Sequence, residues 1–251
     1  MYKPNKVSAI IQARMGSQRL PGKVLLRIIG KSVISHIINR LGFCKQIDEV
    51  ILAVPDTKDN DILEKFAVEN SIKYYRGSEN DVLERFYLAA KENNCDVIVE
   101  VTGDKPLIDP NIVDLAIKRH LKENGNNKFT HYIPDSLPIG LDAGIIDFGV
   151  LKTAHENAKK NYQREHITSY FYENPDIFKI ISIKPPKTLK NPGLRLTLDT
   201  IEDFKLINKI YSDLYNKGEI FQSREIFKLI EKQPELKKIN SHIIQRTVKI
   251  C

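Results

Sequence analysis

The chain of 251 residues contains no tryptophan, few cysteines and no long hydrophobic run. Its cysteines, Cys44, Cys95 and Cys251, are odd in number and include no C-x-x-C pair, which argues against a disulfide framework and against a thiolate zinc site. No apolar run approaches the ~18 residues of a membrane-spanning helix, and residues 1–6 contain no hydrophobic signal-peptide core. We therefore expect a cytoplasmic protein without membrane association.

The net charge of +7 favours anionic partners, a class that includes nucleotides as well as nucleic acids. Part of the excess lies in residues 217–251, and the sequence has no basic stripe interleaved with aromatic residues, which argues against nucleic acid as the partner. The length is sufficient for a substantial buried core, and α/β domains of this size are often single.

The rest of the chain is organised around a short apolar strand that runs into a basic loop. The strand is predicted at residues 7–11, and the loop ends at Lys23, before a helix whose apolar residues recur with a period of 3.6. Backbone N–H groups of a glycine-containing loop can point at an anion. Arg14, Arg19 and Lys23 would neutralise that anion, so the pattern indicates a phosphate site.

This loop matches none of the standard phosphate-binding motifs. A Walker A motif requires a glycine at the position of Ser17 and a serine or threonine after Lys23, where the chain has Val24. The dinucleotide pattern G-x-G-x-x-G is absent as well. From these spacings alone, a bound triphosphate and a solvated basic loop on an ordinary α/β domain both remain open.

Strands alternate with amphipathic helices through the first half of the chain, which predicts an α/β fold with a mostly parallel sheet flanked by helices. In such sheets, ligands bind beyond the carboxyl ends of the strands. The loops at 14–23, 77–85 and 103–109 each follow a predicted strand, so we expect them to converge on one crevice. The predicted strands lie at 7–11, 49–54, 71–76, 96–101, 128–133, 141–148, 178–183 and 193–198.

The second half of the chain is less regular. Residues 1–217 are predicted to form the main domain, with an irregular insertion near 131–170. Within that insertion, one helix is predicted to end near Asn161 and another to open at Gln163. Residues 218–251 are predicted to be a C-terminal helical appendage and tail.

Two acids, Asp104 and Asp199, each follow a predicted strand at positions far apart in the sequence. Two carboxylates that meet over a triphosphate would bind Mg²⁺, which prefers a few carboxylates together with phosphate oxygens and water. Asp199 also precedes a predicted helix, so an ordinary helix N-cap is an equally good interpretation of that residue.

The stretch Gln12-Ala13-Arg14-Met15-Gly16-Ser17, with Arg19-Leu20-Pro21-Gly22-Lys23 after it, resembles the opening of the cytidylyltransferases that activate sugar acids, including the acylneuraminate and 3-deoxy-manno-octulosonate enzymes. It is most similar to the spore coat polysaccharide biosynthesis protein F branch, and later motifs extend the resemblance over most of residues 6–215.

The resemblance implies a Rossmann-like nucleotidyltransferase fold. It also implies that Asp104 of Gly-Asp-x-Pro and Asp199 of Thr-x-Asp-Thr bind Mg²⁺. The nucleotide contacts that it implies come from Ala13, Arg14, Gly16, Ser17, Lys23 and Gly103.

Residues 77–85 resemble the segment of these enzymes that contacts the nucleotide base. Ser78, Asp81 and Arg85 are the candidate nucleotide-binding residues within it, and Arg85 could either pair locally or face the phosphates. Ser78 and Asp81 also suit the start of a helix, so capping remains an equally good interpretation of these side chains.

The acceptor is predicted to bind near Arg164, Glu165 and His166, which resemble the Arg-Glu-His-x-Thr segment of the spore coat branch. We place Arg164 at a helix opening, where its guanidinium could bind a carboxylate or phosphate, while His166 could take a hydroxyl proton. Asp142 lies in a segment similar to the Asp-Gly-Leu-Asp of that branch, with Ile139 in place of the first acid.

The resemblance implies a CTP-dependent cytidylyltransferase that transfers CMP to an acidic acceptor and releases pyrophosphate, in surface polysaccharide or glycoconjugate biosynthesis. The acceptor would be a sugar acid or a phosphorylated or phosphonate compound. The predicted cofactor is Mg²⁺, and the predicted assembly is a homodimer formed through the insertion. The predicted catalytic residues are Arg14, Lys23, Asp104 and Asp199.

Two alternatives belong to other classes of protein. A nucleotide-sugar glycosyltransferase could share the nucleotide-binding architecture, and Asp59-Asn60-Asp61 formally matches its D-x-D motif. These acids stand at a predicted helix start, however, where they favour the helix dipole, so capping is their better interpretation. The second alternative is a basic nucleic-acid-binding protein.

Overall fold

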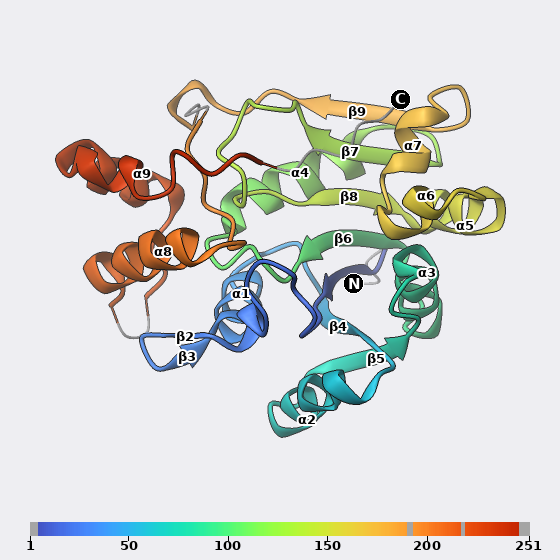
Figure 1. Ribbon diagram of the computed structural model, residues 1–251. Helices are drawn as coiled ribbons and strands as arrows, with labels where there is room; N and C mark the ends of the chain where they lie inside the picture. Colours follow the sequence, from blue (N-terminus) through green and yellow to red (C-terminus); the bar gives the residue numbers. More distant parts are fainter. Residues whose placement is uncertain (1–4, 190–192, 217–218, 246–251) are drawn as a thin grey trace.

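Seven strands form the central sheet in a computed structural model that describes residues 5–189, 193–216 and 219–245 (Figure 1). They are β1 (Val7–Gln12), β4 (Glu49–Pro55), β5 (Lys73–Gly77), β6 (Val97–Thr102), β7 (Lys128–Tyr132), β8 (Gly144–Asp147) and β9 (Lys179–Ile183). The order across the sheet is β5-β4-β1-β6-β8-β7-β9. β5, β4, β1 and β6 are parallel, β8 is antiparallel to both of its neighbours, and β9 is parallel to β7. The predicted α/β fold with a mostly parallel sheet is confirmed.

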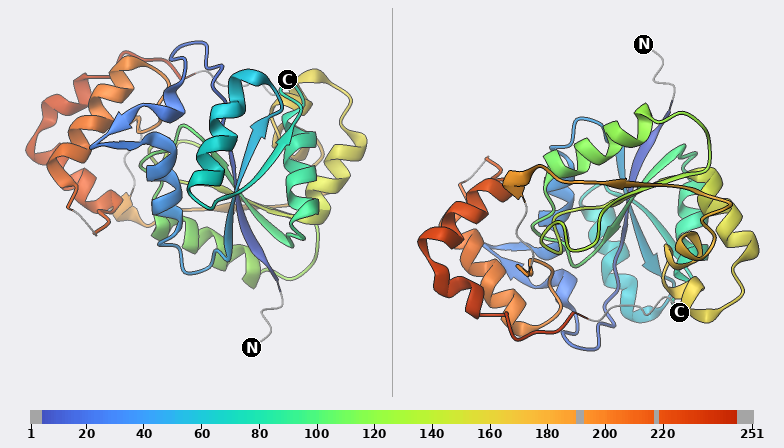
Figure 2. Two further views of the ribbon diagram at one scale, coloured as in Figure 1. Left: turned by 90° about the horizontal axis from the view of Figure 1, so that it is seen from below. Right: turned by 90° about the horizontal axis from the view of Figure 1, so that it is seen from above.

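Helices cover both faces of this sheet (Figure 2). One face packs against α1 (Val33–Leu41), α2 (Asp61–Glu69) and α4 (Pro110–Lys122). The same core cluster extends to α8 (Ile201–Leu214) and α9 (Ser223–Lys232), which lie side by side beyond the carboxyl ends of the parallel strands (Figure 1). The other face packs against α3 (Val82–Glu92), α5 (Phe148–Asn157) and α7 (Ser169–Glu173), and the short α6 (Asn161–Glu165) contacts α3 and α7. Successive residues of a strand therefore enter different layers, as Ile10 and Ile11 of β1 do.

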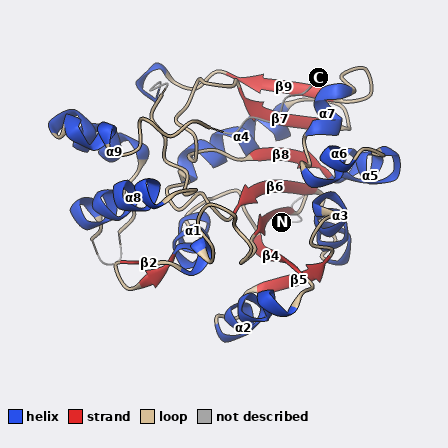
Figure 3. Cartoon of the chain, in the orientation of Figure 1, coloured by secondary structure: helices blue, strands red, loops and turns tan. Residues whose placement is uncertain are grey.

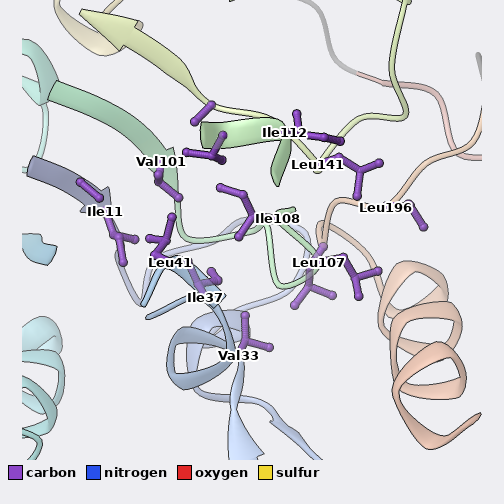
Figure 4. Close-up of a cluster of buried hydrophobic side chains, with 14 of the residues drawn as sticks. Ile11, Val33, Ile37, Leu41, Val101, Leu107, Ile108, Ile112, Leu141 and Leu196 are labelled. Carbon is purple, nitrogen blue, oxygen red and sulfur yellow. The ribbon is translucent and has the colours of Figure 1, made fainter. Parts of the chain in front are cut away.

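The larger core cluster joins the sheet to α1 and α4 (Figure 4). Ile11 and Val101, from neighbouring strands, are fully buried in it. Burial of an aliphatic side chain of this size contributes ~1.5–3 kcal/mol. Leu107 and Leu196 belong to the same cluster, so the turn after β6 and the segment before α8 are both anchored in the core.

Side-chain caps fix the residues at which three of the helices begin. Asp81 caps α3, Asp109 caps α4, and Thr200 forms a reciprocal capping box with Asp203 at α8. Because Thr200 occupies the cap of α8, the interpretation of Asp199 as the N-cap is wrong. The side chain of Asp199 is available for other contacts.

Residues 193–198 do not form the strand that their sequence predicts. A single bridge joins this segment to Ile139, where the Leu196 amide donates to the Ile139 carbonyl over 2.9 Å. Two residues later, the Leu198 amide donates to the Asp104 carbonyl over 2.8 Å. The segment is extended but bonds to two different loops, so it does not join the sheet.

Short elements account for the other differences. β2 (Arg27–Ile28) and β3 (Lys31–Ser32) form a hairpin that the sequence does not predict, because two-residue strands are too short to show an alternating pattern. The helix predicted to end near Asn161 ends at Asn157. The helix predicted to open at Gln163 begins instead at Asn161, as the five-residue α6.

The predicted appendage at 218–251 packs into the same core as the main domain, as far as the structure describes it. Ile226 and Ile230 of α9 belong to the larger cluster, and the buried Arg40 of α1 donates to the Phe221 carbonyl over 2.9 Å. Residues 246–251 of the predicted tail lie outside the described residues. Across the ranges that the structure describes, no helix has both the length and the apolar character needed to cross a membrane.

Replacement of Gly140 by alanine is expected to destabilise the fold. Gly140 has a φ of +103°, and a Cβ there would lie 2.6 Å from the Leu196 carbonyl oxygen. Gly125 is a matched control, because its φ is +95° but a Cβ there would meet no atom within 4 Å. Left-handed backbone costs each variant ~1–2 kcal/mol, whereas Gly140→Ala must also displace the segment before α8. Thermal unfolding should therefore show a larger loss for Gly140→Ala, and equal losses would contradict this packing.

Candidate active site

A cavity of about 480 Å³ opens where β1 and β6 end. The loops that follow these strands meet the loop that leads into α8 (Figure 3). The start of α3 and the end of α6 complete the wall. The predicted site residues that line the cavity are Ala13, Arg14, Ser17, Lys23, Arg85, Gly103, Asp104, Glu165, His166 and Asp199. The predicted convergence is therefore present, although residues 77–85 contribute to it through Arg85 alone among their candidates.

The opening loop is held by backbone contacts at both ends. The Gly22 amide donates to the Met15 carbonyl over 2.9 Å, and Gly22 has a φ of +67°. Near the start of the loop, the Gly103 amide donates to the Gln12 carbonyl over 2.8 Å. A Cβ on Gly103 would lie 3.0 Å from that oxygen, so glycine at this position lets the turn after β6 approach the loop without displacing it.

The middle of the loop is tied down by Asn60, which sequence reasoning missed. This buried side chain accepts a hydrogen bond from the Met15 amide over 2.9 Å and donates to Thr57 over 2.8 Å. Asp59 and Asp61 on either side stand in the first turns of helices, where acids favour the helix dipole, but neither is the N-cap residue, and Asp61 pairs with Arg76. Within this sequence, it is Asn60 that contributes to the site, because it holds the Met15 backbone.

Lys23 joins three segments that are distant in the sequence. Its ammonium nitrogen lies 2.9 Å from Asp199 Oδ1, 3.5 Å from Asp104 Oδ2 and 2.8 Å from the Leu198 carbonyl oxygen. Asp104 also accepts a hydrogen bond from Thr102, the last residue of β6. The two predicted metal-binding carboxylates thus lie beside one cationic group.

Asp199 is surrounded by cations. Besides Lys23, Arg19 lies 3.0 Å and Arg195 2.6 Å from its Oδ2. Burial alone would raise the pKa of Asp199, but Lys23, Arg195 and Arg19 outweigh that effect and hold the pKa below its ordinary value. Asp199 is therefore ionised at neutral pH. Sequence reasoning missed Arg195, which pairs with Asp199 but does not line the cavity, because no local pattern marks such a side chain.

Arg85 is a buried cation without a carboxylate partner in the described part of the chain. Its Nη1 donates to the carbonyls of Ser78 and Glu79, and its Nε has no hydrogen-bond partner there. Burial, followed by repulsion from Arg14, lowers the pKa of Arg85 to about 10. The guanidinium still carries its charge at neutral pH, so this end of the cavity would be stabilised by an electron-rich ligand.

Ser78 and Asp81 do not line the cavity. Ser78 Oγ accepts from the Asp81 amide over 3.0 Å, and Asp81 in turn caps α3. The local contacts support the capping interpretation of both side chains. Gly16, another candidate nucleotide contact, is also absent from the lining, and a Cβ there would lie 3.6 Å from Glu79 Oε1.

Arg164 does not stand at a helix opening, so that prediction is wrong. It lies in the last turn of α6, and its Nε and Nη2 donate to Asp81 Oδ2 over 2.8 and 2.5 Å. Its Nη1 donates to the His155 carbonyl over 2.7 Å. The guanidinium is thus engaged in joining α6 to α3 and α5, whereas its neighbours Glu165 and His166 line the cavity.

Asp142, the remaining acceptor candidate, also lies outside the cavity lining. Lys105 donates to its backbone carbonyl over 2.7 Å and lies 3.5 Å from its carboxylate. Lys105 follows Asp104 directly, so this contact joins the turn after β6 to the loop before β8.

A nucleoside triphosphate suits the charge of this cavity. Its lining contains the cations Arg14, Arg19, Lys23 and Arg85 against the acids Asp104, Asp199 and Glu165. The sheet, the anchored loop after β1 and the acid in the turn after β6 define a Rossmann-like nucleotide-binding fold, in which the ligand lies beyond the carboxyl ends of the strands.

The comparison with known families identifies the branch of this class. The sequence profile of the family described as Cytidylyltransferase matches residues 8–237. The chain therefore belongs to the cytidylyltransferase family, and the predicted resemblance is confirmed. Family membership favours the predicted enzyme over both alternatives.

Individual relatives agree with this assignment. The structure of a cytidylyltransferase from Leptospira borgpetersenii serovar Hardjo-bovis is 33% identical, with a TM-score of 0.87 over 96% of this chain and 100% of that chain. The spore coat polysaccharide biosynthesis protein SpsF of Bacillus subtilis is 29% identical over 236 residues, which cover 92% of this chain and 96% of that protein. The structure of CMP:2-keto-3-deoxy-manno-octonic acid synthetase complexed with CTP has the same fold, with 18% identity and a TM-score of 0.64 over 84% of this chain and 100% of that chain.

Removal of the Asn60 amide is expected to weaken nucleotide binding. Asn60→Ala leaves the Met15 amide without its acceptor, which costs ~1–3 kcal/mol and frees the middle of the opening loop. Calorimetry should then show weaker CTP binding. Asn70→Ala is the control, since Asn70 is exposed and bonds to Phe66 at the far end of α2. Equal CTP affinities for the two variants would show that Asn60 does not organise the loop.

Proposed function

We propose that the protein transfers the CMP group of CTP to an acidic acceptor and releases pyrophosphate. The observation that carries this proposal is the position of Lys23, between Asp104 and Asp199 in a cavity with an excess of cations. The names of the B. subtilis relative and of the octonic acid synthetase support a sugar acid as acceptor and a role in surface polysaccharide or glycoconjugate biosynthesis. A phosphorylated or phosphonate compound has the same anionic character and is the other class to test.

The protein's part in this reaction is to position the reactants and to offset negative charge. An acceptor oxygen must attack the α-phosphorus in line with the departing pyrophosphate, and no covalent protein intermediate is required. Arg14, Arg19 and Lys23 place positive charge along the loop that would hold the triphosphate. Fixed charges of this kind need no reorganisation when the leaving group departs.

Asp104 and Asp199 suit a Mg²⁺ ion. Both carboxylates already contact one cationic nitrogen, that of Lys23, which supports a cation shared between them. Among the described residues, no group of three or more His, Cys, Asp or Glu side chains could hold a metal, so phosphate oxygens and water would complete the coordination, as Mg²⁺ commonly requires. When bound, Mg²⁺ would offset the charge of the phosphate oxygens.

Glu165 and His166 remain the proposed acceptor contacts, because both line the cavity. His166 can accept the proton of the attacking hydroxyl. Arg164 has a different proposed role: through Asp81 it holds the end of α6, and with it Glu165, against α3.

The direct test is release of pyrophosphate from CTP in the presence of Mg²⁺ and candidate acceptors, each assayed beside its neutral analogue. The proposal requires release with an anionic acceptor, a lower rate with UTP, ATP or GTP, and no release with the neutral analogue. Glycosyl transfer from a nucleotide sugar, with no release of pyrophosphate from CTP, would contradict it.

Asp104→Asn and Asp199→Asn should each lower turnover by ~10²–10³-fold, the loss typical of one preorganised charge-stabilising group. They should differ in stability, because Asp199→Asn leaves Lys23, Arg19 and Arg195 without their shared carboxylate. Thermal unfolding should therefore be affected more by Asp199→Asn. Asp213→Asn is the control, since it removes an ion pair with Lys209 on the surface of α8. Near-normal turnover of Asp104→Asn at limiting Mg²⁺ would contradict the two-carboxylate site.

We also propose that the protein is a homodimer formed through residues 131–170. This region interrupts the parallel order of the sheet with the antiparallel β8 and carries α5 and α6. Light scattering at micromolar concentration should give twice the chain mass of 28.8 kDa. A fully active monomer would contradict the proposal.

A further inference from the structure

The C-terminal segment returns to the active-site cavity. The family match ends at residue 237, and the chain continues from there toward the centre of the molecule, beside α8 (Figure 1). Asn240 is 3% exposed, and its amide donates to the Arg195 carbonyl over 3.0 Å and to Asp203 Oδ1 over 2.9 Å. Five residues later, Gln245 lines the cavity together with Arg19 and Asp199.

Arg195 connects this segment to the cavity. Its Nη1 donates to Gln245 Oε1, its Nε donates to Asp203 Oδ1 over 2.9 Å, and its Nη2 donates to Asp199 Oδ2 over 2.6 Å. The Arg195 residue is 6% exposed and has a protein acceptor on each nitrogen of its guanidinium, so the orientation of that group is fixed. Since a guanidinium is planar, fixing one edge also fixes the edge that meets Asp199.

Asp203 also holds Arg195 and Asp199 in place. Its buried carboxylate accepts from the backbone amides of Asp199 and Thr200 over 2.9 and 3.0 Å, in addition to Arg195 and Asn240. Both the main chain and the side chain of Asp199 are thus determined by groups that the C-terminal segment contacts.

We propose that residues 240–245 are part of the active site and act as a positioning element for Asp199. Asn240 anchors the segment, and Gln245 holds the Nη1 edge of Arg195. Arg195 then occupies Asp199 Oδ2, which leaves Oδ1 directed toward Lys23 and toward a cation shared with Asp104. This inference rests on the proposed function, since it assigns the segment to the carboxylate that would bind the metal.

The test compares Gln245→Ala with Gln245→Glu and Ile244→Ala. Gln245→Ala removes the acceptor for Arg195 Nη1, whereas Gln245→Glu replaces the amide oxygen by a carboxylate oxygen, which can still accept that hydrogen bond. Ile244 is 86% exposed, so Ile244→Ala controls for any change in the segment itself. Gln245→Ala leaves one nitrogen of the buried Arg195 guanidinium without its acceptor, so it should also lower the unfolding temperature, whereas Gln245→Glu and Ile244→Ala should leave it nearly unchanged.

Loss of a group that orients a metal ligand typically costs ~10–100-fold in metal affinity or activity. Gln245→Ala should therefore weaken Mn²⁺ binding, measured by electron paramagnetic resonance in the presence of CTP, by ~10-fold or more. The Mg²⁺ concentration for half-maximal rate should rise and kcat should fall, with a smaller change in KM for CTP. Gln245→Glu should keep the Mn²⁺ affinity near the wild-type value, and Ile244→Ala should leave both the Mn²⁺ affinity and kcat near the wild-type values.

Two results would overturn the inference: unchanged Mn²⁺ affinity in Gln245→Ala, or the same loss in Ile244→Ala. Failure of the proposed function is a separate result, because the wild-type protein would then release no pyrophosphate from CTP with any acceptor. The Mn²⁺ comparison uses binding rather than turnover, so it decides the role of Gln245 in that case as well.

Discussion

The ion pairs of Lys23 with Asp104 and Asp199 are the interaction on which the site depends. They connect the loop after β1, the turn after β6 and the segment before α8, and the three side chains are 13, 22 and 12% exposed. At such low exposure, water screens the charges only weakly, and loss of one partner from a buried pair costs ~3–5 kcal/mol because the other charge is left uncompensated. A bound nucleotide and metal would redistribute these charges within the same group of residues.

The fold supplies this arrangement through contacts that involve no catalytic group. Asn60 holds the opening loop, Gly103 allows the turn after β6 to approach it, and the Leu196 backbone packs against Gly140. The capping box of Thr200 and Asp203 starts α8 directly after Asp199. Each contact limits the position of one carboxylate or of the loop that carries the cations. Together these contacts bring the charged side chains into one place.

The sequence predicts the parts of the site that are local in the chain. The strand, the basic loop and the turn after β6 are contiguous patterns, so Arg14, Lys23 and Asp104 could be placed in advance at one edge of the sheet. Arg195, Asn60 and Gln245 could not, because their partners are distant in sequence and a buried polar contact leaves no periodic signal. Arg164 shows the opposite error: its motif is recognisable, but Asp81 occupies its guanidinium. The strand predicted at 193–198 failed for a related reason, since an apolar extended segment bonds equally well to loops.

We propose that Arg14, Lys23, Asp104 and Asp199 form one site for a metal-bound nucleoside triphosphate. The most direct measurement is a crystal structure of the protein with Mg²⁺ and a CTP analogue that cannot release pyrophosphate. We expect the triphosphate to lie against the loop that carries Arg14 and Lys23, with Mg²⁺ bound by Asp104 and Asp199. The structure has another cavity, of about 380 Å³, which Lys45, Lys118 and Arg224 help to line. A nucleotide bound there, or a metal bound away from both carboxylates, would contradict this proposal.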